Sequence, residues 1–261
     1  MPVSYRPCTT NAEYEQIKAL EVAIWQMPAH EAITTHTLHV LTHNGGLALG
    51  AFDEGRMIGM AVAFATRHPQ RLWSHMAGVR PDYQGAGIGY QLKQAQRDWA
   101  LANDYTEMRW TFDPALRRNA NFNFHQLGAI THIYHANFYG VMQDAINAGV
   151  PSDRFEAHWQ LDTNPVTHTP PTDLTFLLCA DDNQRPQITS HPHARYHGVQ
   201  CPYDFHAIKA DDLDCALAWR ATMREVLQGA FAQGYHVVDF VTDPAQRRCY
   251  YVLHRYPVGD F

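Results

Sequence analysis

The sequence predicts an α/β protein in which a mixed β-sheet is flanked by helices and followed by a smaller C-terminal α/β unit. Three observations support this prediction. Apolar runs of strand length alternate with segments whose apolar residues recur at helical spacing. The strand-like run 72–79 passes through a glycine-rich turn directly into a helix-like segment. The stretch 163–172 is rich in Thr and Pro, so we expect a first domain over 1–162, a linker over 163–172 and a second unit over 173–261.

Local signals predict the first elements. Thr10 and Glu13 have the spacing of a capping box, which begins a helix. The apolar runs 47–52 and 57–64 are separated by a short turn sequence, so they predict a β-hairpin. The helix after the glycine-rich turn is predicted from four apolar residues at helical spacing: Ile88, Leu92, Ala95 and Trp99.

The next elements continue the alternation of strands and helices. Residues 107–112 predict a strand, and residues 119–127 predict a helix that Gly128 ends. Two further strands are expected over 130–139 and 155–161.

The second unit has fewer signals. We expect a strand over 174–179, loops over 180–202 and a helix that Asp211 caps. The alternating segments 235–242 and 249–255 then predict a pair of strands.

Composition excludes several classes of function. A net charge of −6 argues against non-specific nucleic-acid binding. The chain has no apolar run of the roughly 18 residues that span a bilayer, and its N-terminus lacks a signal-peptide core. We therefore expect a cytoplasmic protein with neither nucleic-acid nor membrane partners. The 5 cysteines form no Cys-x-x-Cys pair and the 17 histidines are scattered, so we expect neither disulfides nor a metal site.

The segment 79–89 carries the strongest functional signal, because a strand, a turn with three glycines and a helix follow one another there. Glycines let the backbone turn tightly and approach a ligand closely. The N-terminus of a helix offers unpaired N–H groups and a positive dipole end, which suit a phosphate or pyrophosphate. The alternative is a tight turn that serves helix packing alone. The segment is neither a P-loop nor a Gly-x-Gly-x-x-Gly motif.

Gln84 to Gly89 have the form Gln-x-x-Gly-x-Gly and follow Val-Arg-Pro. This pattern resembles the acyl-CoA-binding motif of the GCN5-related N-acetyltransferase (GNAT) superfamily, and the resemblance covers about residues 3 to 161. The two-part chain also resembles a subgroup of predicted acetyltransferases. The resemblance implies that the fourth and fifth strands splay apart and that acetyl-CoA, or another acyl-CoA, is the co-substrate. The residues it assigns to this cofactor are Met76, Ala77, Gly78, Val79, Gln84, Gly85, Ala86, Gly87, Ile88 and Gly89.

The catalytic groups of the superfamily are only partly matched. Phe124 stands at the position of the usual tyrosine acid and cannot donate a proton. Trp73 stands near the usual carboxylate base, and His75 lies two residues further on the same strand. His75 is therefore our candidate for the general base, since a free imidazole has a pKa of about 6.5. The alternative is a histidine packed in the sheet.

The resemblance implies an N-acyltransferase that moves an acetyl group, or another short acyl group such as succinyl, from acyl-CoA to the primary amine of a small molecule, for example an amino acid. A non-catalytic CoA-binding or regulatory protein stays open, as Phe124 would suggest, and so does a protein N-acetyltransferase. Arg220 and Arg224 share one helical face, where they either bind a substrate carboxylate or simply face water or a neighbouring acid. The sequence also leaves a homodimer open.

Overall fold

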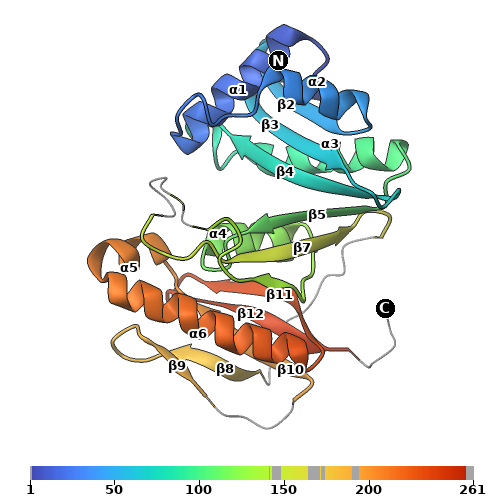
Figure 1. The fold of residues 1–261 in the computed structure, drawn as a ribbon. Helices are drawn as coiled ribbons and strands as arrows, with labels where there is room; N and C mark the ends of the chain where they lie inside the picture. The colour runs from blue at the N-terminus through green and yellow to red at the C-terminus, as the bar shows by residue number, and fades with distance from the viewer. Residues whose placement is uncertain are drawn as a thin grey trace. The chain divides into compact units, whose positions relative to one another are not determined.

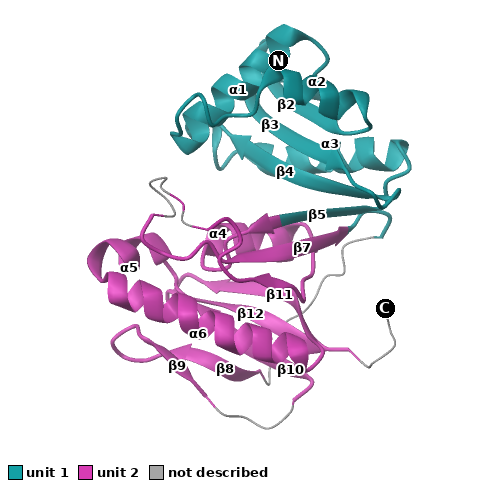
Figure 2. Cartoon of the chain, in the orientation of Figure 1, with its two compact units in different colours: residues 1–110, 160–164 teal, residues 111–159, 165–261 magenta. Residues whose placement is uncertain are grey.

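The computed structural model describes residues 2–140, 142, 148–163, 171, 174–189 and 194–256. Contacts divide the chain into two compact units (Figure 2), the first made of residues 1–110 and 160–164 and the second of residues 111–159 and 165–261. The predicted linker 163–172 lies outside the described residues, apart from residues 163 and 171. The domain boundaries that the sequence suggested stay a prediction.

Unit 1 is built on a sheet with the strand order β1-β2-β3-β4-β5 (Figure 1). Neighbouring strands from β1 to β4 pair antiparallel, whereas β4 and β5 pair parallel. Strand β5 continues into unit 2 after Trp110. The bounds are Ser4–Pro7 for β1, Leu47–Asp53 for β2, Arg56–Ala65 for β3, Arg71–Val79 for β4 and Glu107–Phe112 for β5.

Three α-helices cover this sheet: α1 (Asn11–Trp25), α2 (Thr35–His43) and α3 (Ile88–Ala102). The capping box predicted at the start of α1 is present, with Thr10 and Glu13 each bonded to the other's backbone. Helix α2 was not predicted, and the side chain of Thr34 caps it.

The two faces of the unit 1 sheet have different coverings. On β3, Met60 and Val62 join a buried cluster with residues of α1 and α2, such as Ile17 and Leu38. Side chains alternate along a strand, so Ala61 and Ala63 point to the other face. That face is covered by α3, which contacts β1 to β4. The site described below is built where β4 leaves this sheet.

Unit 2 contains a second sheet with the order β11-β12-β10-β8-β9 and helix α6 packed on it (Figure 1). Short elements precede this sheet in the chain, and β6 pairs antiparallel with β7. The bounds are Arg117–Ala120 for α4, Asn121–Gln126 for the π-helix η2, Tyr134–His135 for β6, Arg154–Gln160 for β7, Thr175–Ala180 for β8, Pro186–Ile188 for β9, Tyr196–Cys201 for β10, Phe205–Asp211 for α5, Leu213–Ala232 for α6, Tyr235–Asp243 for β11 and Arg248–Arg255 for β12.

The two sheets with their helices confirm the predicted α/β class, but three local predictions are wrong. Asp211 does not cap the long helix of unit 2, because it is the last residue of α5 and Asp212 is the N-cap of α6. The expected strand over 130–139 is reduced to β6 and two isolated bridges, because a turn with Asn137 at a positive φ of 48° interrupts it. The expected loops over 180–202 contain β9 and β10. His, Gly and Gln within β10 hide its strand character, although four of its six residues are buried.

The core of unit 2 joins residues from distant parts of the chain. Phe124 of η2 and Phe155 of β7 pack edge-on against Tyr251 of β12. Asp113 and Arg220 form a buried bidentate ion pair at 2.5 and 2.8 Å. The early segment and the C-terminal strands therefore share one core within this unit.

Candidate active site

The glycine-rich segment has the strand–turn–helix form that the sequence predicted. After β4, residues Pro81–Tyr83 make one turn of 3₁₀ helix, η1. Gly85 and Gly87 then have positive φ values of 85° and 77°, in the left-handed region that favours glycine. A Cβ added at either glycine would meet nothing within 4 Å. The turn is thus open to solvent and able to receive a ligand.

The start of α3 has free hydrogen-bonding capacity at this turn. Gly87 is the N-cap residue, and no side chain there bonds to the first turn of the helix. The first helical bond joins the N–H of Gln91 to the carbonyl of Gly87. The N–H groups of Ile88, Gly89 and Tyr90 consequently lie at the positive end of the helix without intrahelical acceptors. This arrangement suits an anionic group such as a pyrophosphate.

Gln84 shapes the turn from within. Its side-chain Nε2 donates to the carbonyl of Val79 at 3.2 Å, which ties the turn to the end of β4. The backbone N–H of Arg80 donates to the carbonyl of Ile58 at 2.9 Å and holds the start of the turn against β3. One of these bonds joins the two ends of the Val79–Gln84 segment, and the other joins the segment to β3.

Strands β4 and β5 form a fork. Over the described residues, their recorded pairing joins Arg71–Trp73 to Glu107–Arg109 and stops there. The rest of β4 stays paired with β3 on its other side as far as Val79. The edge of β4 after Trp73 can therefore pair with an extended ligand, as a further strand would.

All ten predicted cofactor residues belong to this fork and turn. Met76 packs against the cluster beneath α1 and α2, and a Cβ on Gly78 would lie 2.8 Å from Ile24. Val79 contacts the α3 side, where its Cγ2 lies 3.8 Å from the Cβ position of Gly89. The side chains are thus used for packing, while the backbone edge faces the fork.

His75 occupies a bulge in β4. Val62 pairs with Met76 and Ala63 pairs with Ser74, which leaves His75 without a partner residue on β3. The imidazole makes an edge-to-face contact with Phe64 at 5.3 Å between ring centroids. Although the residue is exposed, the protein on one side of the ring removes water and lowers the pKa of His75 below 6.5. A lowered pKa keeps the imidazole neutral at pH 7, as a general base requires.

A hollow of about 480 Å³ lies beside Phe64 on the α2 side of the sheet. It is mainly apolar, and none of its lining residues carries a carboxylate: His36, Thr37, Val40, Leu41, Asn44, Phe64 and Ala65. Sequence reasoning missed this hollow because α2 was not predicted. The structure also shows that Val40, which lines this hollow, has 64% of its surface exposed to solvent.

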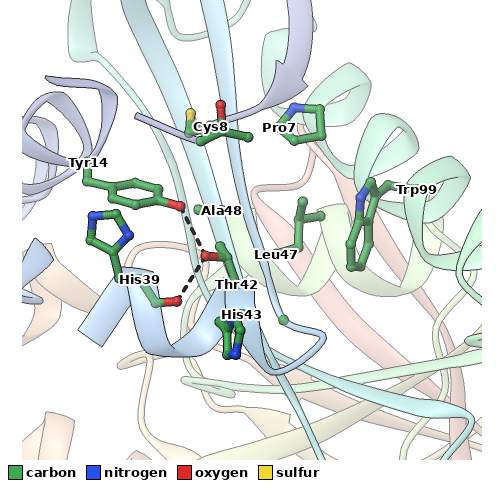
Figure 3. Close-up of a pocket in the computed structure, with 11 residues that line it drawn as sticks. Pro7, Cys8, Tyr14, His39, Thr42, His43, Leu47, Ala48 and Trp99 are labelled. Carbon is green, nitrogen blue, oxygen red and sulfur yellow. Dashed lines mark hydrogen bonds between the residues drawn. The ribbon is translucent and has the colours of Figure 1, made fainter. Parts of the chain in front are cut away.

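Another hollow in unit 1, of about 400 Å³, contains no residue of the glycine turn (Figure 3). It lies at the start of β2, and β2 runs parallel to β4, so it is at the end of the sheet opposite the turn. The hydroxyl groups of Tyr14 and Thr42 bond to each other there at 3.0 Å. Burial raises the pKa of the Cys8 thiol to about 12, so this thiol stays protonated at neutral pH and is a poor nucleophile.

The other candidate residues lie in unit 2 and are already engaged there. Arg224 forms a bidentate pair with Asp153 at 2.7 and 3.0 Å, and Arg220 pairs with Asp113. The two arginines therefore bind neighbouring acids. Tyr134 donates to Asp153 at 2.6 Å, and burial raises the pKa of its phenol far above the usual value.

Within the described ranges, no group of three or more His, Cys, Asp or Glu side chains is arranged to hold a metal ion. None of the helices in the described part of the chain combines the length and apolar character of a membrane span.

Comparison with known families finds a match over the segment that contains the glycine turn. Residues 11–129 match the Acetyltransferase (GNAT) family, a range that includes β2 to β5, the glycine turn and α3. The domain that contains residues 11–129 belongs to the GNAT superfamily. The family confirms the class that the sequence predicted, an acyl-CoA-dependent N-acyltransferase. No curated protein matches the chain.

Solved structures share the GNAT fold at low sequence identity. A GNAT-family acetyltransferase of Desulfovibrio desulfuricans is 15% identical, with a TM-score of 0.50 over 61% of this chain and 99% of that one. The ribosomal-protein-S18-alanine N-acetyltransferase of Escherichia coli is 12% identical, with a TM-score of 0.51 over 64% and 99%. The protein yncA of Salmonella typhimurium, solved with its cofactor acetyl-CoA, is 18% identical, with a TM-score of 0.50 over 66% and 100%. This GNAT chain is thus longer than the three proteins it is similar to.

Proposed function

We propose that this GNAT protein transfers an acetyl or other short acyl group from acyl-CoA to the primary amine of a small molecule. The fork between β4 and β5, which ends in the open glycine turn, is the observation that carries the proposal. In the reaction the amine nitrogen attacks the thioester carbon, the C–S bond breaks, and the CoA thiolate leaves. The nitrogen loses a proton to a base.

The fork and turn supply the cofactor site in this proposal. The free edge of β4 over Met76 to Val79 pairs with the pantetheine arm of acyl-CoA. The N–H groups from Gly85 to Gly89 receive the pyrophosphate, with the α3 dipole favouring its charge. Anchoring both the arm and the pyrophosphate fixes the thioester, so the attack becomes effectively intramolecular.

His75 is the proposed base. It lies on β4 directly before the four cofactor residues, and its lowered pKa leaves it able to accept a proton at neutral pH. Its contact with Phe64 also places it next to the hollow below α2. An amine held in that hollow would approach the imidazole along Phe64.

The lining of this hollow indicates the substrate class. A polyamine or an aminoglycoside carries several positive charges and needs acidic partners. The lining residues of the hollow contain none, and Val40, Leu41 and Phe64 give it an apolar wall. A small amine with an apolar side chain, such as an aliphatic or aromatic amino acid, fits these walls best.

A thiol-release assay tests the proposal. Acetyl-, propionyl- and succinyl-CoA are each combined with amino acids, polyamines and short peptides, and CoA release is followed with a thiol reagent. We expect the highest kcat/KM for an apolar amino acid or its amine analogue. Tight CoA binding without turnover on any amine would favour a non-catalytic CoA-binding protein. Turnover on peptides alone would favour a protein N-acetyltransferase.

A further inference from the structure

A buried polar cluster lies on the α3 face of the fork. The ammonium group of Lys93 in α3 is at its centre, and the residue is 3% exposed. Its Nζ donates to Ser74 Oγ at 3.1 Å, to Gln96 Oε1 at 2.9 Å and to Met108 Sδ at 3.4 Å. It also lies 4.1 Å from the centroid of the Trp110 ring. One lysine thus contacts both strands of the fork.

The contacts fall where the two strands separate. The last recorded pair of β4 and β5 is Trp73 with Arg109. Ser74 is the next residue on β4, and Trp110 is the next residue on β5. The Lys93 ammonium therefore lies at the base of the fork.

Three charged residues on the same two strands bond to one another. Arg71, Glu107 and Arg109 form an ion-paired group, with bonds of 2.6 and 2.5 Å to the glutamate. They alternate along the strands with Ser74, Met108 and Trp110, so they lie on the opposite face of the sheet. Arg97, one turn after Lys93 on α3, donates to the carbonyl of Leu161 at 2.7 Å.

Burial of a charge at this place has a cost in folding stability. Removal of an ammonium group from water costs several kcal/mol, and burial lowers the pKa of Lys93 to about 7. Gln96 adds to the cost, because its buried Nε2 has no hydrogen-bond partner among the described residues. An aliphatic side chain at position 93 would pack against Met108 and Trp110 without these penalties. A role of the charged group in the function of the protein would explain why position 93 is a lysine.

We propose that Lys93 is a positioning residue of the acyl-transfer site. It ties β4 to β5 at the base of the fork and gives that base a positive potential. This inference rests on the proposed function, in which the thioester of acyl-CoA enters the fork. During attack, negative charge develops on the carbonyl oxygen and then on the leaving sulfur. A fixed positive charge in a water-poor site stabilises that charge.

Lys93→Met tests the role, and Lys18→Met on α1 is the matched control. We expect Lys93→Met to reduce kcat about tenfold or more, with KM and the Kd for CoA within about threefold of wild type. The melting temperature should stay level or rise, because a buried charge is removed. The control should change none of these quantities. A parallel loss of kcat and melting temperature would mark Lys93 as structural, and an unchanged kcat would also overturn the proposal.

The pH profile gives a second readout. The ammonium loses its proton as the pH rises through about 7, so the wild-type kcat should fall above that pH. Lys93→Arg keeps its charge and should move this fall to higher pH, whereas Lys93→Met should lack it. A wild-type profile that rises steadily from pH 6 to 9 would contradict the proposed role of the charge.

A measurement without turnover separates this proposal from the function on which it rests. Lys18, Lys93 and Lys209 are the lysines of the chain, so their ¹³Cε signals can be assigned from single Lys→Met variants. Acetyl-CoA should shift the Lys93 signal and leave the Lys18 signal in place. If wild type releases no thiol with any amine, the proposed function fails, whatever the spectrum shows. If wild type is active but the Lys93 signal ignores acetyl-CoA, the inference about Lys93 fails alone.

Discussion

Replacing Gly87 by aspartate should weaken CoA binding sharply, whereas replacing it by asparagine should not. Gly87 is the N-cap of α3, with a φ of 77°, and a Cβ there would meet nothing within 4 Å. Both replacements therefore fit sterically, and Asn and Asp are the residues that best tolerate the left-handed region after glycine. The two variants have the same shape and differ by one negative charge.

The magnitude follows from Coulomb's law. For the estimate we assume a separation of about 5 Å between a carboxylate at position 87 and a pyrophosphate on the first N–H groups of α3. At an effective dielectric constant of about 40 to 80, each pair of charges repels by about 1 to 2 kcal/mol. Two phosphate charges give about 2 to 3 kcal/mol, which corresponds to roughly a 30- to 150-fold higher Kd. For Gly87→Asn we expect a change of about threefold or less, since no charge is added.

Isothermal calorimetry with CoA measures both variants, and thermal melting shows that they fold. Salt supplies a further check, because the Debye length falls from about 10 Å at 0.1 M to about 3 Å at 1 M. The ratio of the two Kd values should therefore shrink towards one as NaCl is added. Equal Kd values for folded Gly87→Asp and Gly87→Asn at low salt would refute the assignment of the pyrophosphate to this turn.

Three further predictions concern the catalytic rate, the pH dependence of stability and the effect of a truncation. His75→Ala should lower kcat about a hundred-fold, leave the Kd for CoA nearly unchanged and remove the acidic limb of the rate profile, which we expect below pH 6.5; an active variant with the wild-type profile would make His75 structural. Burial, and then the nearby histidines, lower the pKa of His236 to about 4. Its contribution to stability, up to about 3 kcal/mol, should thus be complete above pH 6.5 and lost as the pH falls towards 4. Urea titrations of His236→Asn should show a flatter dependence, and His30→Asn, at an exposed site, should match wild type. Truncation after Leu161 should yield a poorly soluble or much less stable protein; a soluble, fully active 1–161 fragment would contradict this.

Local signals explain which elements could be predicted from the sequence. The capping box of α1, the β2–β3 hairpin and the β4–turn–α3 unit depend on residues within a few positions of one another. Strand β10 depends instead on its place between β12 and β8. Its His, Gly and Gln residues break the apolar alternation, and the sequence does not show its neighbours.

The same contrast holds for the candidate site. The strand–turn–helix form of the glycine turn could be predicted because it is a contiguous motif, whereas its role in cofactor binding and the role of His75 as a base stay predictions. The Lys93 cluster joins three elements, so spacing along one helix could not reveal it. The apolar residues whose spacing predicted α3 include Ala95 and Trp99, whereas the buried residues of α3 include Leu92, Gln96 and Ala100. Lys93 and Gln96 are polar residues on the buried face of α3, and sequence reasoning missed them.

The core of unit 2 gives a physical reason for the phenylalanine at position 124. Phe124 is 2% exposed, and its ring packs edge-on against Phe112, Phe155 and Tyr251. A tyrosine there would bury a hydroxyl group among rings, at a cost of about 1 to 3 kcal/mol unless it found a partner. Position 124 therefore serves packing against the C-terminal strand β12, and another group must assist the leaving thiolate. A free thiol has a pKa of about 8.5, so its anion leaves readily near neutral pH and needs a positive potential more than a proton. The absent tyrosine is therefore compatible with catalysis, and it makes the charge of Lys93 more important to the proposed reaction.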